Sequence, residues 1–229
     1  LIHLAETKAE VESIRSRTGL SPVAFLDRLG LLGERLTAAH CIFVDPEDIA
    51  LLRDRGVGIA HNMVANVKSA KGVAPVPRML DEGLRVGLGT EGPMSGNTLD
   101  IIGQMGYVAK IHKLILGDPT ALPAAEVVAL ATIGGARALH MEDRIGSLEP
   151  GKLADIVVIG IDSPAMAPVY DVYSALVYAA SARDVRTTIV HGQTIMDDGS
   201  LLNVNEVEVR NRIEALAERI RSVVGDLKE

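Results

Sequence analysis

The sequence predicts an α/β fold in which short buried strands alternate with helices. Four apolar runs have the length of strands and are separated by helical patterns; they cover residues 1–5, 36–40, 57–61 and 85–90. These runs lack the regular polar alternation of a half-exposed strand, as expected for parallel strands that are covered on both faces. We therefore expect successive βα units that share one parallel sheet.

Capping residues mark the helices between these strands. A hydroxyl or Asp residue at the N-cap, or Pro in the first turn, begins each helix, and Gly follows the end of three of them. The first helix also has Glu10 three residues after Thr7, which is the spacing of a capping box. These signals predict helices over residues 7–17, 21–29, 45–55 and 75–82.

The second part of the chain has a different pattern. Two longer helices are predicted over 99–116 and 123–139, the latter interrupted at Gly134-Gly135, followed by a turn-rich connector at 146–152. Beyond it we expect a strand at 154–159, a helix at about 170–180, a hairpin of 185–190 with 194–196, and an amphipathic helix at 205–224. The predicted division is therefore a βα part (1–145), a small β appendage with one helix (146–204) and a closing helix (205–229).

Composition excludes several classes of protein. The 229 residues include 23 basic and 30 acidic ones, a net charge of -7, which argues against a nucleic-acid partner because phosphate binding needs clustered Lys and Arg. No apolar run is long enough to span a bilayer, and no signal peptide is evident, so we expect no membrane partner. A single cysteine, Cys41, excludes an internal disulfide and fits a reducing cytoplasm.

The first residues indicate that a longer chain is involved. Leu1 is not an initiator Met, and residues 1–4 are typical of the end of a strand that is already under way. We expect the sequence to be the C-terminal part of a longer protein.

Three strand ends carry residues that could hold a metal. His3, with Glu6 three residues later, ends the first strand, His40 ends the second, and Glu91 is the first ionisable group after strand 85–90. Taken alone, His3 could be a core histidine and Glu6 an acid favoured by a helix N-terminus. The pattern repeats at strand ends, which is where α/β barrels have their active sites. We therefore favour a hydrolytic zinc site formed by imidazoles and a carboxylate over separate structural roles for these residues.

The remaining candidates are weaker. His61 follows the third strand, and it is either braced by Asn62 and Asn66 or lines a substrate site, two alternatives that the sequence leaves open. Structural roles are predicted for His112, His140 and Cys41.

A set of motifs over nearly the whole chain resembles one known family. The motifs are His3-Leu4-Ala5-Glu6-Thr7, Ala39-His40-Cys41, His61-Asn62, Ala74-Pro75-Val76-Pro77, Gly87-Leu88-Gly89-Thr90, Asn97, residues 146–152, Asp155, residues 162–164 and residues 170–180. In combination they are similar to the second half of the metal-dependent amidohydrolases, above all the methylthioadenosine/S-adenosylhomocysteine deaminase branch, with the triazine chlorohydrolases as a related group.

This resemblance implies a fold and a set of roles. The fold is the C-terminal half of a distorted TIM (β/α)8 barrel that carries a small β-sandwich. His3 would bind the metal from the fifth strand, Glu6 would shuttle protons, and His40 would polarise the substituents of the attacked carbon. Glu91 stands where the family has an aspartate that binds the metal and takes the proton of its water.

The function implied is deamination of an adenine-like or related N-heterocycle by metal-activated water. One divalent metal is expected, zinc or alternatively iron, and we assign substrate contacts to Glu6, His61 and Ser95. The chain would act as a homo-oligomer or with the N-terminal half of the barrel. Two alternatives stay open: a catalytically silent fragment or assembly piece, and displacement of chloride from a triazine-like ring.

The sequence departs from the family pattern at two points. The paired histidines of the family's first strand are absent from this chain, and Glu91 replaces an aspartate. One extra methylene moves a carboxylate by roughly 1.5 Å, whereas metal–ligand distances are held to about 0.2 Å. We therefore expect a compensating shift of the backbone at residue 91.

Overall fold

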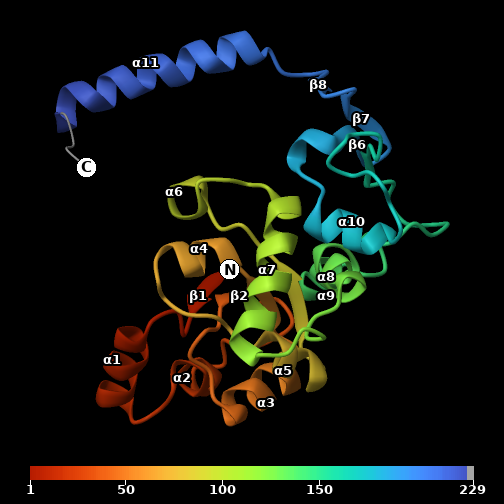
Figure 1. The fold of residues 1–229 in the computed structure, drawn as a ribbon. Coiled ribbons are helices and arrows are strands. Elements are labelled where there is room, and N and C mark those ends of the chain that lie inside the picture. The colour runs from red at the N-terminus through yellow and green to blue at the C-terminus, as the bar shows by residue number, and fades with distance from the viewer. Residues whose placement is uncertain (226–229) are drawn as a thin grey trace. The chain divides into compact units, whose positions relative to one another are not determined.

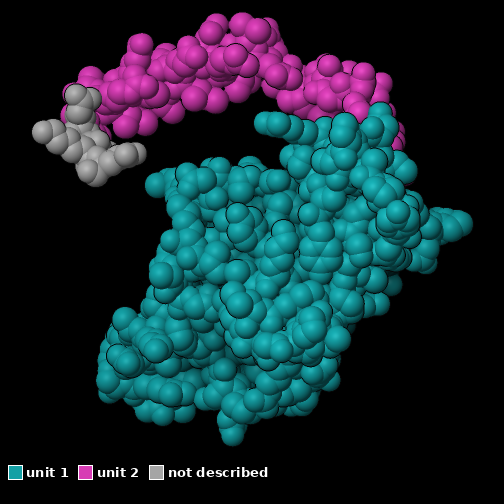
Figure 2. Space-filling model, viewed as in Figure 1, with its two compact units in different colours: residues 1–153, 161–184 teal, residues 154–160, 185–229 magenta. Residues whose placement is uncertain are grey.

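The computed structural model describes residues 1–225, which form two compact units (Figure 2). The first unit contains residues 1–153 and 161–184, and the second contains residues 154–160 and 185–225 of the described chain. The predicted division into segments 1–145, 146–204 and 205–229 stays a prediction. The last four residues of the predicted closing segment 205–229 lie outside the described residues.

The first unit is built on a four-stranded parallel sheet in the order β1-β2-β3-β4 (Figure 1). The strands are β1 (Ile2–Leu4), β2 (Thr37–His40), β3 (Gly58–His61) and β4 (Arg85–Leu88), as the apolar runs predict. The register pairs His3 with Ala39, Ala38 with Ile59, and Ile59 with Val86. Because every pairing is parallel, the carboxyl ends of the four strands lie along one edge of the sheet.

The capping signals place four helices close to their predicted positions: α1 (Lys8–Thr18), α2 (Pro22–Arg28), α3 (Pro46–Asp54) and α5 (Val76–Asp81). Thr7 accepts a hydrogen bond from the backbone N–H of Glu10, and Asp45 and Asp48 form a reciprocal capping box. Two short helices were not predicted, α4 (Met63–Lys68) and α6 (Pro93–Gly96). Helix α4 has neither a side-chain cap nor a proline in its first turn, so both signals used for the other helices are missing. Helix α6 begins with Pro93 but has only four residues, too few for a helical pattern.

Strands and helices bury a continuous apolar core against the sheet. Its fully buried members come from every strand and from most of the covering helices; they include Leu4, Val23, Ala38, Ile49, Leu52, Ile59, Met63, Met79, Val86, Val108 and Val127. Each buried Leu, Ile or Val side chain contributes on the order of 2 kcal/mol to folding. This core fixes the relative positions of the strand ends.

The predicted helix 123–139 is broken, but at a different residue from the one expected. It consists of α8 (Ala124–Ala131) and α9 (Ile133–Ala138), with the break at Thr132. The prediction of a break at Gly134-Gly135 was therefore wrong. These glycines serve close packing instead, since a Cβ on Gly134 would lie 2.7 Å from the carbonyl oxygen of Val86.

The remaining elements of the first unit are α7 (Ile101–Leu116), α10 (Val172–Tyr178) and a short 3-10 helix, η1 (Ala182–Asp184). Helix α10 packs against α7 and α8. The second unit is an antiparallel sheet of β5 (Ile156–Ile159), β6 (Val185–Val190), β7 (Gln193–Asp197) and β8 (Ser200–Leu201), followed by α11 (Glu206–Val224).

The predicted hairpin around His191 and Gly192 is the β6–β7 pair of this second unit. Strand β8 has two residues, too few for a detectable pattern. The structure describes one sheet here, and the second layer of a β-sandwich stays a prediction. Within residues 1–225, no helix is both long enough and apolar enough to cross a bilayer.

Candidate metal centre

Four of the predicted site residues come together at the carboxyl edge of the parallel sheet. His3 lies in β1, Glu6 follows it, His40 ends β2, and Glu91 lies just beyond β4. One ligand atom from each residue can be chosen so that all four atoms lie within 4.8 Å of one another. This group of His3, Glu6, His40 and Glu91 is called the strand-end cluster below.

The backbone is left-handed at several points around the cluster. The φ angle is 49° at Ala5, 74° at His40, 46° at Cys41 and 57° at Glu91. Residues with a Cβ avoid this region, and such strain is concentrated at functional sites. Glu91 also has this conformation, and its side chain lies within the cluster. The compensating backbone shift expected at residue 91 stays a prediction.

His40 is completely buried and is held by one hydrogen bond. Its Nδ1 lies 2.7 Å from Oδ1 of Asn66, an oxygen that only accepts, so Nδ1 carries the proton in this pairing. Its Nε2 therefore presents a lone pair when the ring is neutral. The His3 ring meets the His40 ring edge to face, with centroids 4.8 Å apart.

Both carboxylates face His40. The Nε2 atom of His40 lies 3.4 Å from Oε1 of Glu6 and 3.9 Å from Oε2 of Glu91. The other oxygen of Glu6 lies 3.8 Å from Nδ1 of His3, and the other oxygen of Glu91 accepts a hydrogen bond of 2.9 Å from the hydroxyl of Ser95. Glu91 is thus oriented by a residue of α6.

Two buried atoms of the cluster have no hydrogen-bond partner, Nε2 of His40 and Oε2 of Glu91. An unsatisfied buried polar atom is costly, by about 1–3 kcal/mol. Both are electron-pair donors, and they face each other without a donor hydrogen between them. Imidazole nitrogens and carboxylate oxygens in this arrangement suit a divalent cation, so the residues fit a metal site.

A lysine that the sequence analysis did not single out also contacts the cluster. The ammonium of Lys71 forms an ion pair with Oε1 of Glu6. Burial raises the pKa of Glu6, but the hydrogen bond from Lys71 and the charges of His40, Lys71 and His3 outweigh it, so the pKa is lowered. The pKa of Lys71 is raised, mainly by the same bond. The pair is therefore ionised.

His61 ends β3, the strand beside the one that ends in His40, and it is not held by Asn66, one of the two partners in the braced alternative. Its Nε2 lies 3.4 Å from Nε2 of His112, and the predicted partner Asn66 bonds to His40 instead. The side chain of Asn62 lies close to Gly89, where an added Cβ would come within 2.2 Å of its Oδ1. The contacts of Asn66 with His40 and of Lys71 with Glu6 were missed because these partners are far apart in the sequence.

This buried histidine pair predicts a pH-dependent stability. Burial, with the neighbouring His112 adding to it, lowers the pKa of His61 to about 3, and burial lowers the pKa of His112 to about 4. Unfolded histidines titrate near pH 6.5, so the unfolded chain binds more protons below that pH. The free energy of unfolding should therefore fall by up to roughly 1.4 kcal/mol per pH unit for each histidine as the pH drops from about 6.5 to 5.

Urea unfolding at pH 7, 6 and 5 measures this slope. The substitution His112→Leu should reduce it, whereas His191→Ala, in the exposed β6–β7 turn, should leave it unchanged. An equal slope in all three proteins would contradict the assignment.

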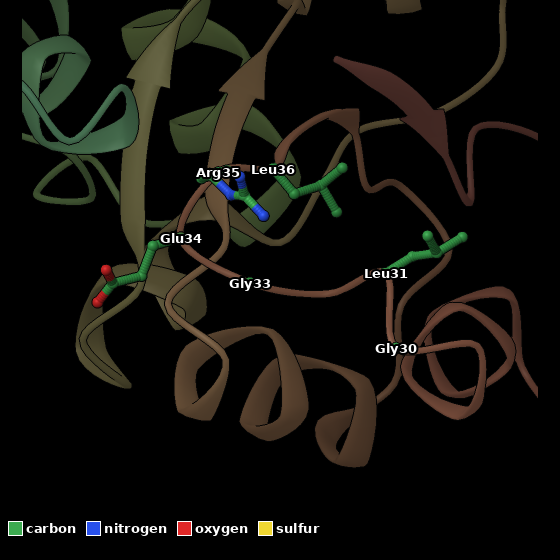
Figure 3. Close-up of a pocket in the computed structure, with 6 residues that line it drawn as sticks. All are labelled: Gly30, Leu31, Gly33, Glu34, Arg35 and Leu36. Atoms are coloured by element: carbon green, nitrogen blue, oxygen red, sulfur yellow. The ribbon is translucent and has the colours of Figure 1, made fainter.

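A separate pocket lies at the opposite end of the sheet (Figure 3). Its lining residues follow one stretch of loop that leads into β2; they are Gly30, Leu31, Gly33, Glu34, Arg35 and Leu36. Leu36 precedes the strand and His40 ends it, so the two lie about 13 Å apart at roughly 3.3 Å per residue. The pocket is therefore distinct from the strand-end cluster.

Comparison with known families gives one match that covers most of the chain. The model of the amidohydrolase family matches residues 1–195. A curated protein of Syntrophobacter fumaroxidans, named 5-methylthioadenosine/S-adenosylhomocysteine deaminase, is 48% identical over 221 residues, which are 96% of this chain and 50% of that protein.

Solved structures give the same result. A crystal structure described as an adenosine deaminase from Xanthomonas campestris with bound zinc has a TM-score of 0.93 and 34% identity. The match covers 96% of this chain and 50% of that chain. The zinc complex of atrazine chlorohydrolase from Arthrobacter aurescens has a TM-score of 0.86 and 28% identity, with coverage of 93% of this chain and 47% of that chain. The chain spans about half the length of the relatives it matches.

Proposed function

The chain belongs to the amidohydrolase family, and from this premise we propose that the intact protein is a metal-dependent aminohydrolase that deaminates an adenine-like N-heterocycle. The observation that carries the proposal is the strand-end cluster, in which Nε2 of His40 and Oε2 of Glu91 are buried electron-pair donors without a partner. The fold class is α/β, and the chain corresponds to about half of a TIM barrel of the type found in this family.

His3 and Glu91 are the proposed metal ligands of this chain. Zinc is the proposed metal, because both similar crystal structures contain it, and iron is the alternative. Catalytic zinc usually has three protein ligands, so further ligands would come from outside this chain. A bound divalent metal supplies a Lewis acid and lowers the pKa of a coordinated water to about 7.

The other residues of the cluster handle protons. Deamination replaces a C–N bond of the ring by a C–O bond, so a proton must leave the attacking water and one must reach the departing amine. Glu91 accepts one proton of the attacking water and returns it to the departing amine, and Glu6 carries the other proton of the water to the ring nitrogen beside the attacked carbon. His40, fixed by Asn66, lies against the substituents of the attacked carbon, and His61 and Ser95 are the remaining proposed substrate contacts.

Deamination is favoured over displacement of chloride by the similarity itself. The deaminase of Syntrophobacter fumaroxidans is 48% identical to this chain, whereas the atrazine chlorohydrolase is 28% identical. The names of the former and of the zinc-containing adenosine deaminase support adenine nucleosides as the first candidate substrates.

The open edges of the parallel sheet support the proposal that further polypeptide covers them. In the described sheet β1 and β4 are the outer strands, each paired on one side only. Unpaired strand edges promote aggregation unless they are covered. We place another part of the barrel, or another copy of the protein in a homo-oligomer, against these edges. A cytoplasmic location agrees with the single free thiol, Cys41, which is buried.

Substrate profiling of the intact, zinc-loaded protein tests the proposed function. Adenosine, 5-methylthioadenosine and S-adenosylhomocysteine should release ammonia, and a chlorotriazine at the same concentration should release little chloride. Chloride release that exceeds ammonia release would reverse the assignment, and release of neither product would reject it.

A further inference from the structure

Lys71 is the cation that contacts the strand-end cluster. It lies in the loop after α4, its side chain is 28% exposed, and its ammonium pairs with Oε1 of Glu6. The charge of Glu91 also raises the pKa of Lys71, which indicates that the ammonium lies in the field of both acids. The metal ligands and catalytic residues proposed above do not include Lys71.

The loop is built so that Lys71 is held in place. Its backbone N–H donates to the carbonyl oxygen of Asn66 at 3.0 Å, and the side chain of Asn66 holds His40. The φ angles of 52° at Ala70 and 131° at Gly72 turn the chain on either side of the lysine. A Cβ on Gly72 would lie 2.9 Å from Cγ2 of Ile42, so this turn packs closely on the segment after β2.

The two carboxylates of the cluster differ because of this lysine. Oε1 of Glu6 lies 3.4 Å from Nε2 of His40, and it is also the oxygen that Lys71 occupies. Oε2 of Glu91 faces the same nitrogen at 3.9 Å and has no hydrogen-bond partner. Glu91 therefore has a free oxygen that faces His40, whereas the oxygen of Glu6 that faces His40 is bonded to Lys71 and only its other oxygen, 3.8 Å from Nδ1 of His3, is left.

We propose that Lys71 is a positioning residue that keeps Glu6 out of the coordination shell of the metal and so reserves Glu6 for proton transfer. This inference rests on the proposed metal-dependent function and adds a residue to it. A carboxylate oxygen in a charge-assisted hydrogen bond has fewer lone-pair directions left for a metal, and an ammonium beside the site repels a second cation.

Charge counting gives the size of the effect. With neutral histidines, Glu6, Glu91 and Lys71 carry a net charge of about -1 before metal binding, and removal of the ammonium makes it about -2. A unit charge a few ångströms from a divalent cation in a partly exposed site changes the affinity by on the order of tenfold. The substitution Lys71→Met should therefore bind the metal about tenfold more tightly.

The experiment titrates the intact apoprotein with Zn2+ against a competing chelator and records the visible absorption of the Co2+ form. Lys71→Met and Lys71→Gln should both bind Zn2+ more tightly, and their Co2+ absorption should weaken as Glu6 joins the shell and raises the coordination number. Their kcat for ammonia release should fall at least tenfold with a smaller change in KM, and Lys71→Arg should restore all three properties.

The matched control is Arg78→Met, which removes a cation from an exposed pair with Glu82 and changes the net charge equally. Unchanged metal affinity and Co2+ absorption in both neutral Lys71 variants, with unfolding transitions like that of the wild type, would overturn the proposal. The proposal would also be overturned if Arg78→Met tightened metal binding as much as the neutral Lys71 variants do. Because the titrations need no substrate, failure of the proposed activity would be recognised separately, as a wild-type protein that binds metal and releases no ammonia.

Discussion

Replacing His3 by alanine is expected to lower the metal affinity and the rate of ammonia release by more than a hundredfold. His3 supplies one of the two proposed metal ligands of this chain. Substitution of a residue that only orients a metal ligand already lowers metal affinity or activity by about 10–100-fold. Its side chain is 58% exposed in the described chain, so its removal should cost little folding stability. Metal content by elemental analysis and ammonia release by a coupled assay measure the two effects in the intact protein.

The control for this substitution is His191→Ala. His191 is exposed in the β6–β7 turn and contacts Asp155 through its backbone N–H, so metal content and rate should stay at the level of the wild type. Full activity of His3→Ala at a normal metal content would remove His3 from the proposed site.

Replacing Glu6 by glutamine is expected to reduce kcat by about 10²–10⁴ while the metal content is retained. The amide keeps the shape of the side chain but cannot accept and return a proton, and general acid–base catalysis contributes about that factor. The ion pair with Lys71 becomes a weaker hydrogen bond in this variant, so part of the loss reflects a less well oriented side chain. Single-turnover rates with metal-loaded protein measure the chemical step.

Glu12→Gln is the matched control, because Glu12 is an exposed residue on the neighbouring helix α1. It should leave kcat unchanged. If Glu6→Gln kept the wild-type kcat, or if it lost the metal, Glu6 would not be the proton-transfer residue that we propose.

Much of the fold could be predicted from local signals. Thr7 with Glu10, Ser21 with Ala24, and Asp45 with Asp48 cap their helices through hydrogen bonds between residues three apart. Such capping signals depend only on neighbouring residues, so they can be recognised without knowing where the segment packs in the fold. The errors occurred where such a signal was missing, as in α4, and where the helix has only four residues, as in α6. A further error occurred at Gly134-Gly135, where the glycine pair allows close packing and does not break the helix.

The place of the candidate site followed from the sequence for a related reason. In a parallel sheet all strands end at one edge, so His3, His40 and Glu91 at three strand ends were expected along that edge. That Glu91, beyond the outer strand β4, reaches His40 at the end of β2 was decided by the tertiary structure. The partners of these residues could not be found in the same way. The hydrogen bond of His40 with Asn66 spans 26 residues, and the ion pair of Glu6 with Lys71 spans 65.

The sequence by itself determined the strands, the helix caps and the types of side chain that the carboxyl edge of the sheet presents, because these depend on local hydrogen bonding and on the direction of each strand. Only the tertiary structure decided which oxygen faces which nitrogen. The hydrogen bond with Asn66 determines which ring nitrogen of His40 carries the proton. Ser95 donates a hydrogen bond that orients Glu91, and Lys71 donates one to Oε1 of Glu6. Such contacts depend on how loops pack on the finished sheet to within a few tenths of an ångström, and no pattern of neighbouring residues encodes that distance.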